Sequence, residues 1–204
     1  MTFFRHCATP MLLAGALLLA GCASKPPGNS VYDFGPLPPA AAPAAAARSG
    51  IDTLVMADVT GPASLDTQRM YYRLLYADAQ QSRPYAYNQW GVTPVQLLSQ
   101  RLRARIAQAG VKVLNTADAA TGLPLLRLEV DEFSQSFDAP AHSSGTVTLR
   151  ASVFRNHRLL DQRSFSRTVE AASADAPGGV RALAAASDAV AADILAWLPT
   201  LPAK

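Results

Sequence analysis

The sequence predicts an α+β domain: a mostly antiparallel β-sheet with two amphipathic helices packed on one face, preceded by a signal peptide and a Pro/Ala-rich tether. Alternating apolar and polar residues indicate strands at 123–137, 145–154 and 158–170. Apolar residues spaced three and four apart indicate helices at 93–109 and 177–197. An apolar N-terminal run, followed by a stretch rich in Pro and Ala, precedes all of them. Helices covering one face of an antiparallel sheet form one of the few stable layer arrangements.

Residues 1–21 have the organisation of a secretory signal peptide. Arg5 supplies the positive charge, and residues 11–20 are almost purely Leu and Ala. The run ends in Leu19-Ala20-Gly21-Cys22, which resembles the lipobox of bacterial lipoproteins. That resemblance implies a diacylglycerol on the Cys22 sulfur, cleavage just before it, and a mature chain that begins there. Cys22 is therefore the predicted lipid attachment site.

Two alternatives to a lipid anchor remain at this N-terminus. An ordinary signal peptide could carry Cys22 by chance, or the run could stay in the membrane as a helix. The run is shorter than the roughly 20 apolar residues that span a bilayer, and the polar and Pro residues 24–27 end it. An Asp after the Cys would resemble an inner-membrane retention signal. Ala23 stands there instead, which indicates the periplasmic leaflet of the outer membrane.

Residues 22–50 form the expected tether. Six prolines and the run 44–47 of alanines favour an extended chain over a packed one. Residues 31–34, with Tyr32 and Phe34, interrupt this composition, and two aromatic side chains are poorly suited to a mere spacer. We expect a short edge strand there, docked on the globular domain.

The globular domain is expected at 51–199, with a tail at 200–204. A first strand at 51–59 has apolar residues at every second position, starting with Ile51, and Gly61-Pro62 breaks it. Helix and strand compete over 65–76. The two adjacent tyrosines there favour a strand at 68–75, which would pair with 84–90 across a turn at 78–83.

The helix at 93–109 has the clearest end signals in the chain. Thr93 and Gln96 form a capping box, and Pro94 suits the first helical position. An apolar stripe faces the core, and three arginines (Arg101, Arg103 and Arg105) lie off its centre. Gly110 stands where a left-handed C-terminal cap belongs, before a short strand at 111–114.

The last part of the domain reads as an antiparallel meander followed by a helix. In the strand at 123–137, Leu126, Leu128 and Val130 face the core. Asn156-His157 is the predicted turn between the second and third strands of the meander. Pro177-Gly178-Gly179 then starts the second helix, and prolines after Trp197 end it.

Composition and motifs argue against an enzyme, a metal site or a cofactor. The net charge of +3 is too small for a nucleic-acid-binding surface. The chain has two cysteines; one lies in the signal peptide and the other takes lipid, so no disulfide forms within a mature chain. His142 and His157 lie in predicted turns without further ligands nearby, and no phosphate loop or nucleophile elbow is present. Glu129, Asp131 and Glu132 are better explained as a solvated strand surface than as an acid–base pair.

Aromatic residues gather between 71 and 90 and alternate with arginines. Some of these residues must belong to the core. The rest could form an exposed patch, and Arg and Tyr together are enriched at protein interfaces. The candidate interface residues are Tyr72, Arg73, Tyr85, Tyr87 and Trp90.

The order of several motifs is similar to the ABC-type transport auxiliary lipoprotein family, whose best-known branch is the PqiC lipoproteins. The shared features are the lipobox, 32–36 (YDFGP), Tyr72-Arg73, Trp90 before a capped helix, and 128–137 (LEVDEFSQSF). The likeness covers roughly residues 20–198. The family often has a charged residue beside the Trp, whereas this chain has Gln89 and Gly91.

The resemblance implies a non-catalytic, outer-membrane-anchored lipoprotein that faces the periplasm and serves an MCE-type lipid transport system. It would dock the periplasmic MCE protein, which carries phospholipid between the membranes. Because MCE proteins form rings, a ring-like homo-oligomer of this lipoprotein is a further expectation. Two alternatives remain: direct binding of lipid by the domain itself, and a role in envelope assembly unrelated to lipid transport.

Overall fold

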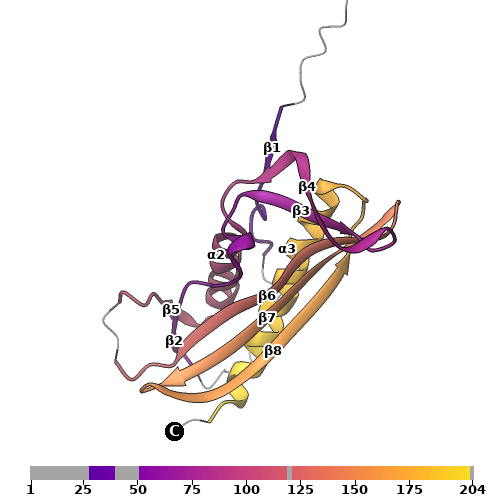
Figure 1. The fold of residues 1–204 in the computed structure, drawn as a ribbon. Coiled ribbons are helices and arrows are strands. Elements are labelled where there is room, and N and C mark those ends of the chain that lie inside the picture. Colours follow the sequence, from indigo (N-terminus) through magenta and orange to yellow (C-terminus); the bar gives the residue numbers. More distant parts are fainter. Residues whose placement is uncertain (1–27, 40–50, 119–120, 203–204) are drawn as a thin grey trace, which may run out of the picture.

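The computed structural model describes residues 28–39, 51–118 and 121–202 of the chain. The predicted signal peptide, Cys22 and most of the predicted tether lie outside these residues. The described part forms an eight-stranded sheet with two α-helices on one of its faces (Figure 1), so the predicted α+β class is confirmed. The elements in chain order are β1 (Ser30–Tyr32), β2 (Thr53–Met56), η1 (Ala63–Leu65), β3 (Arg69–Leu74), β4 (Asp78–Trp90), α2 (Pro94–Gln108), β5 (Lys112–Leu114), β6 (Leu125–Ala139), β7 (His142–Arg155), β8 (Arg158–Glu170), α3 (Ala176–Trp197) and η2 (Leu198–Thr200).

The predicted meander is the long antiparallel part of the sheet, β6–β7–β8. Leu126, Leu128 and Val130 of β6 are at most 2% exposed, as their alternation predicted. The turn between β7 and β8 is made by Asn156 and His157, both in the left-handed region, with φ of 50° and 63°. That conformation matches the right-handed twist of the strands that the turn joins.

The remaining strands join the sheet at the other edge of β6, where two different strands pair with successive parts of β6. The first part of β6 pairs in parallel with β2, which in turn pairs with β5. The last part pairs in parallel with β3, from Tyr72 opposite Gln135 to Leu74 opposite Phe137. β3 continues the sheet to β4 and then to the edge strand β1. One strand therefore has two different neighbours along one edge, and the chain between β2 and β3 passes through the gap.

The two helices bury the predicted apolar stripes. Val95, Leu98, Leu102 and Ile106 of α2 are at most 8% exposed. α3 lies along β7 and β8 and also contacts α2 (Figure 1). Within the described residues, the stretch from α3 through η2 is long and apolar enough to cross a membrane, but more than half of it is buried in the domain, as in a core helix.

Three details of the predicted elements are corrected. In β2, Leu54 and Met56 are the most deeply buried residues rather than the alternate set that includes Val55, because neighbouring strands and the helices enclose β2. The predicted turn at 78–83 belongs to β4, which pairs with β3 as far as Asp78. Arg101 is only 7% exposed, so it lies inside the helix layer and not beside it.

Candidate functional site

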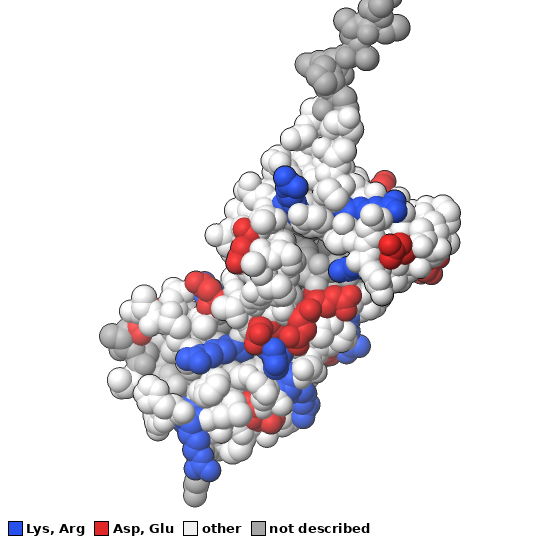
Figure 2. Space-filling view, in the orientation of Figure 1, with Lys and Arg blue, Asp and Glu red and all other residues white. Residues whose placement is uncertain are grey.

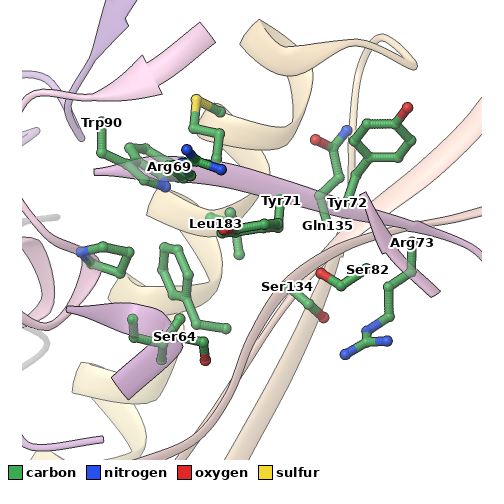
Figure 3. A pocket seen from close by; sticks show the side chains of 14 residues that line it. Ser64, Arg69, Tyr71, Tyr72, Arg73, Ser82, Trp90, Ser134, Gln135 and Leu183 are labelled. Carbon is green, nitrogen blue, oxygen red and sulfur yellow. The ribbon is translucent and has the colours of Figure 1, made fainter. Parts of the chain in front are cut away.

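A pocket of about 290 Å³ lies in the fork between β3 and β6, and we call it the fork pocket. The two strands pair only from Tyr72 and Gln135 onward, so before that point they diverge. η1 and the start of α2 close the opening from the side, and α3 closes it from behind (Figure 3). The lining residues are Ser64, Leu65, Arg69, Met70, Tyr71, Tyr72, Arg73, Ser82, Trp90, Pro94, Phe133, Ser134, Gln135 and Leu183.

The inner wall of the fork pocket is apolar and rigid. Trp90, Met70 and Leu183 are 2–3% exposed. The Trp90 ring lies 5.7 Å from that of Phe133, and Phe34 packs on both rings from the far side, at 5.9 Å and 6.1 Å between centroids. Such edge and tilted contacts add about 0.5–1.5 kcal/mol per pair beyond area burial. Phe34, which follows β1, therefore supports two wall residues without lining the pocket itself.

The rim of the fork pocket carries positive charge. Among the described residues, neither Arg69 nor Arg73 has a carboxylate partner. The Arg73 guanidinium donates to the carbonyls of Ala79 and Gln80, at 3.3 Å and 3.1 Å, but those bonds leave its charge uncompensated. Figure 2 shows basic side chains together with a few acidic ones over the β3–β4 hairpin, and acidic ones gathered over the middle of β6.

A buried glutamine ties the β3–β4 hairpin to the rest of the domain. Gln135 is 1% exposed, and its Oε1 accepts from the Tyr85 hydroxyl at 2.9 Å. Its Nε2 donates to the Ser143 hydroxyl and to the Asp175 carbonyl, each at 3.0 Å. Burial, with the nearby charges of Tyr72 and Asp175, raises the pKa of Tyr85 far above its ordinary value, so this hydroxyl remains a neutral donor. Sequence reasoning missed Gln135, because a lone Gln on a strand carries no signal.

Exposed apolar side chains concentrate on the same hairpin and on β1. Four large hydrophobic residues, which we call the hairpin surface, are 47–59% exposed there: Val31, Leu75, Tyr76 and Tyr87. Among the described residues, the fifth of this kind is Leu159, in β8 at the β7–β8 turn, which Figure 1 places at the other end of the molecule. The hairpin surface therefore marks one end of the domain.

The five predicted interface residues take different positions. Tyr87 is 52% exposed and belongs to the hairpin surface. Tyr72, Tyr85 and Arg73 are half-buried, with Tyr72 packed 4.6 Å from the Tyr85 ring between centroids. Trp90 is corrected: it is a core residue behind the fork pocket, because β4 turns its last side chain toward the helices. The predicted lipid site, Cys22, lies outside the described residues.

A charge cluster between the two helices also escaped sequence reasoning. Asp188 of α3 accepts bidentate hydrogen bonds from Arg101, at 2.7 Å and 2.8 Å, and from Arg105, at 2.7 Å and 2.5 Å. The same arginines donate to carbonyls of the N-terminal segment, Arg101 to Gly35 at 3.4 Å and Arg105 to Pro38 at 3.3 Å. The i, i+4 spacing of the arginines was the available signal, since it places them on one helix face.

Several titratable groups elsewhere have structural partners. Within the described residues, no three His, Cys, Asp or Glu side chains gather as metal ligands would. His142 pairs with Asp138 and Glu170, and the hydrogen bond to Asp138 is the main cause that raises its pKa. Glu129 and Asp131 pair with Arg150 at 3.0 Å and 3.2 Å.

Comparisons with known proteins agree with this architecture. The family described as "ABC-type transport auxiliary lipoprotein component" matches residues 32–195. Protein XCC0632 from Xanthomonas campestris is 17% identical, with 71% of this chain and 82% of that chain covered and a TM-score of 0.62. An uncharacterized protein is 16% identical, with 83% and 97% covered and a TM-score of 0.65. No curated protein matches the sequence. The two solved structures share the fold.

Proposed function

Because the chain belongs to the ABC-type transport auxiliary lipoprotein family, we propose that it is a non-catalytic accessory subunit of an MCE-type lipid transport system. In this proposal a lipid on Cys22 anchors the protein in the outer membrane, facing the periplasm. The domain then docks the periplasmic MCE component. A ring of several copies is part of the proposal, and a monomer in light scattering of the solubilised full-length lipoprotein contradicts that part.

Docking of the N-terminal segment supports an anchoring role. β1 pairs in parallel with the end of β4, and Gly91 N–H donates to the Tyr32 carbonyl at 2.7 Å. Phe34 packs against both Trp90 and Phe133, and two arginines of α2 donate to the carbonyls of Gly35 and Pro38 beyond it. A pull on the tether is therefore taken up by the sheet and by both helices. Segment 40–50 then leads on to β2.

The hairpin surface is the observation that carries the docking proposal. Exposed large apolar side chains are a mark of interaction sites, and four of the five among the described residues lie on the β3–β4 hairpin and on β1. The hairpin also presents tyrosine and arginine, which are enriched at interface hot spots. Hydrogen bonds through Gln135 and the ring contacts of Tyr72 make this surface rigid, so little conformational freedom is lost when a partner binds.

Photocrosslinking in intact cells tests the proposal. A photoreactive phenylalanine at Tyr87 should capture the MCE component, while the same group at Leu159 should not. The two positions are matched because they are 52% and 47% exposed and lie at opposite ends of the domain. Equal capture of the MCE component from both positions, or capture from Leu159 alone, contradicts docking at the hairpin surface.

A further inference from the structure

We infer that the fork pocket binds one acyl chain of an anionic amphiphile, with the tail against Trp90 and the charged head at Arg69. The inference goes beyond docking, because it concerns the purified chain without any partner. It depends on three properties of the pocket, namely its size, the chemistry of its interior and the charge of its rim.

The size of the pocket selects a narrow ligand. Its volume of about 290 Å³ is near the lower bound of small-molecule sites, which span roughly 300–1,000 Å³. A nucleotide or a large cofactor does not fit such a space. A single unbranched chain does, because it is narrow enough to enter between the two diverging strands, where Leu183 of α3 also lines the pocket (Figure 3).

The interior of the pocket selects an apolar tail. Leu65, Met70, Trp90, Phe133 and Leu183 supply its walls. The polar side chain of Gln135 also lines the pocket, but Ser143 and Asp175 already accept from its amide nitrogen, and the Tyr85 hydroxyl donates to its oxygen. A hydrogen-bond acceptor of a ligand placed beside Gln135 would lose its water without gaining a donor from that amide, at a cost of about 1–3 kcal/mol. Methylene groups carry no such penalty.

The rim selects a negative head. Arg69 has no hydrogen bond or ion pair through its guanidinium among the described residues, and Arg73 keeps an uncompensated charge. On the opposite side of the mouth, Ser134 donates to Glu132 at 2.8 Å, so β6 presents negative charge there. The head of an anionic amphiphile therefore belongs on the β3 side. Guanidinium groups bind carboxylate and phosphate through paired N–H donors, so either head group suits Arg69.

The chain contains its own reporter for this ligand. It has two tryptophans, and among them Trp90 lines the pocket whereas Trp197 packs on Phe165 and donates to Asp161. Bromine quenches tryptophan fluorescence only on contact. We would titrate the mature chain carrying Cys22→Ser, which needs no detergent, with ω-bromododecanoate below its micelle concentration. Trp197→Phe leaves Trp90 as the reporter, and Trp90→Phe leaves Trp197.

Saturable quenching of Trp90 without quenching of Trp197 is the expected result, and α-bromododecanoate should quench less because its bromine stays at the rim. Should Trp197→Phe fail to fold, the difference between the parent chain and Trp90→Phe carries the same information. Equal quenching of both reporters, or no saturable quenching with any probe, overturns the inference. If no probe quenches saturably, the pocket would instead accommodate an apolar side chain of a partner protein.

Head-group preference is tested separately. Arg69→Gln should weaken binding of the carboxylate about fivefold, which corresponds to the loss of one partly exposed charge-assisted contact. It should leave the neutral ω-bromododecanol unaffected. Arg127→Gln is the control, because Arg127 is an arginine on a strand that does not line the fork pocket, and its guanidinium carbon lies 5.0 Å from the centre of the Phe154 ring. ω-Bromododecyl phosphate distinguishes the two head groups, and tighter binding of either anion supports the inference. Binding of the alcohol as tight as that of both anions contradicts the role of Arg69.

Discussion

Asp188 links the two helices, and through them the N-terminal segment, by its contacts with two arginines. It receives four charge-assisted hydrogen bonds from two arginines, and those arginines also hold the N-terminal segment. Burial of the carboxyl is the largest single influence and raises its pKa, but the hydrogen bonds and charges of Arg105 and Arg101 together outweigh it. The pKa of Asp188 therefore lies below its ordinary value.

Replacing Asp188 with Asn should destabilise the domain markedly. It would leave the Arg101 guanidinium, whose side chain is 6% exposed, without a counter-charge. We expect a loss of about 2–3 kcal/mol in the free energy of unfolding, somewhat below the roughly 3–5 kcal/mol of a fully buried pair. Asp193→Asn is the control, because Asp193 also lies on α3 and pairs with one arginine, but that Arg167 side chain is 51% exposed. Asp193→Asn should lower the free energy of unfolding in urea by less than about 1 kcal/mol.

The difference in stability between the parent chain and Asp188→Asn should depend on pH. Because the folded-state pKa of Asp188 is depressed, its contribution is complete above the unfolded-state pKa of about 3.9 and is lost as the pH falls toward the folded value. The stability gap between the parent chain and Asp188→Asn should therefore hold from neutral pH down to about 4 and narrow below that. A gap that narrows instead as the pH rises from neutral would contradict this assignment.

Among the elements, α3 and the meander approach each other so closely that side chains are excluded at two places. Gly145 of β7 lies against the α3 backbone, where a Cβ would come within 2.8 Å of Leu183 N and 3.0 Å of the Ala182 carbonyl carbon. Gly179 lies against Gln135, where a Cβ would come within 2.0 Å of Oε1. These two contacts fix the distance between α3 and the sheet near the fork pocket.

Gly145→Ala should force α3 away from β7. We expect a cost of about 1–3 kcal/mol, which is typical of overpacking a close contact. Gly91→Ala is the matched control, since a Cβ there would meet Val31 Cγ1 at 3.4 Å and the Tyr32 carbonyl oxygen at 3.6 Å, which are ordinary contacts. That control should stay within about 0.5 kcal/mol of the parent chain by thermal or urea unfolding. Equal effects of the two substitutions would argue against the close contact.

β1 is held mainly through the residue that follows it. Removing the Phe34 ring deletes two aromatic contacts, each contributing about 0.5–1.5 kcal/mol. Phe34→Ala should therefore speed hydrogen exchange of the Gly91 amide, which bonds to Tyr32, by about tenfold or more. Val31→Ala is the control, because that side chain is 59% exposed. Unchanged exchange at Gly91 in Phe34→Ala would show that the backbone pairing alone holds β1.

At the scale of the whole molecule, the functional features gather at one end. β1, the hairpin surface and the mouth of the fork pocket all belong to the β1–β4–β3 side of the sheet, while α3 ends at the opposite end (Figure 1). In the proposed arrangement, a tether that leads from Cys22 to β1 would place the proposed partner surface and the proposed ligand site on the side that faces the proposed anchor.

Cys22→Ser tests the anchor. We expect the variant to remain an unlipidated precursor and to lose normal outer-membrane partitioning in sucrose-gradient fractionation, because stable attachment takes more than one acyl chain. Cys7→Ser, which lies within the predicted signal peptide, is the control and should partition normally. Because both cysteines lie outside the described domain, neither substitution should change its fold. Normal partitioning of Cys22→Ser would defeat the lipid-anchor proposal.

Sequence periodicity predicted β6, β7, β8 and both helices well, since each of them has its own repeat, whereas it missed the first half of β4. The meander, the capping of α2, the buried stripe of α3 and the turn at Asn156 were all predicted from local patterns. The five predicted interface residues are not all exposed. Tyr87 is exposed as an interface residue must be, whereas Trp90 is in the core, and residue type alone could not separate the two.

By itself, then, the sequence determined the fold class, the family and most element boundaries to within a few residues, with the start of β4 as the exception. The tertiary structure alone decided that β6 has two successive neighbours along one edge, which opens the fork pocket, and that Gln135 and Asp188 are buried among partners distant in the chain. The physical reason is the distance along the chain between the residues that interact. Helix and strand preferences come from neighbours a few residues apart, whereas strand order, pockets and buried polar networks depend on contacts between segments that local patterns do not relate.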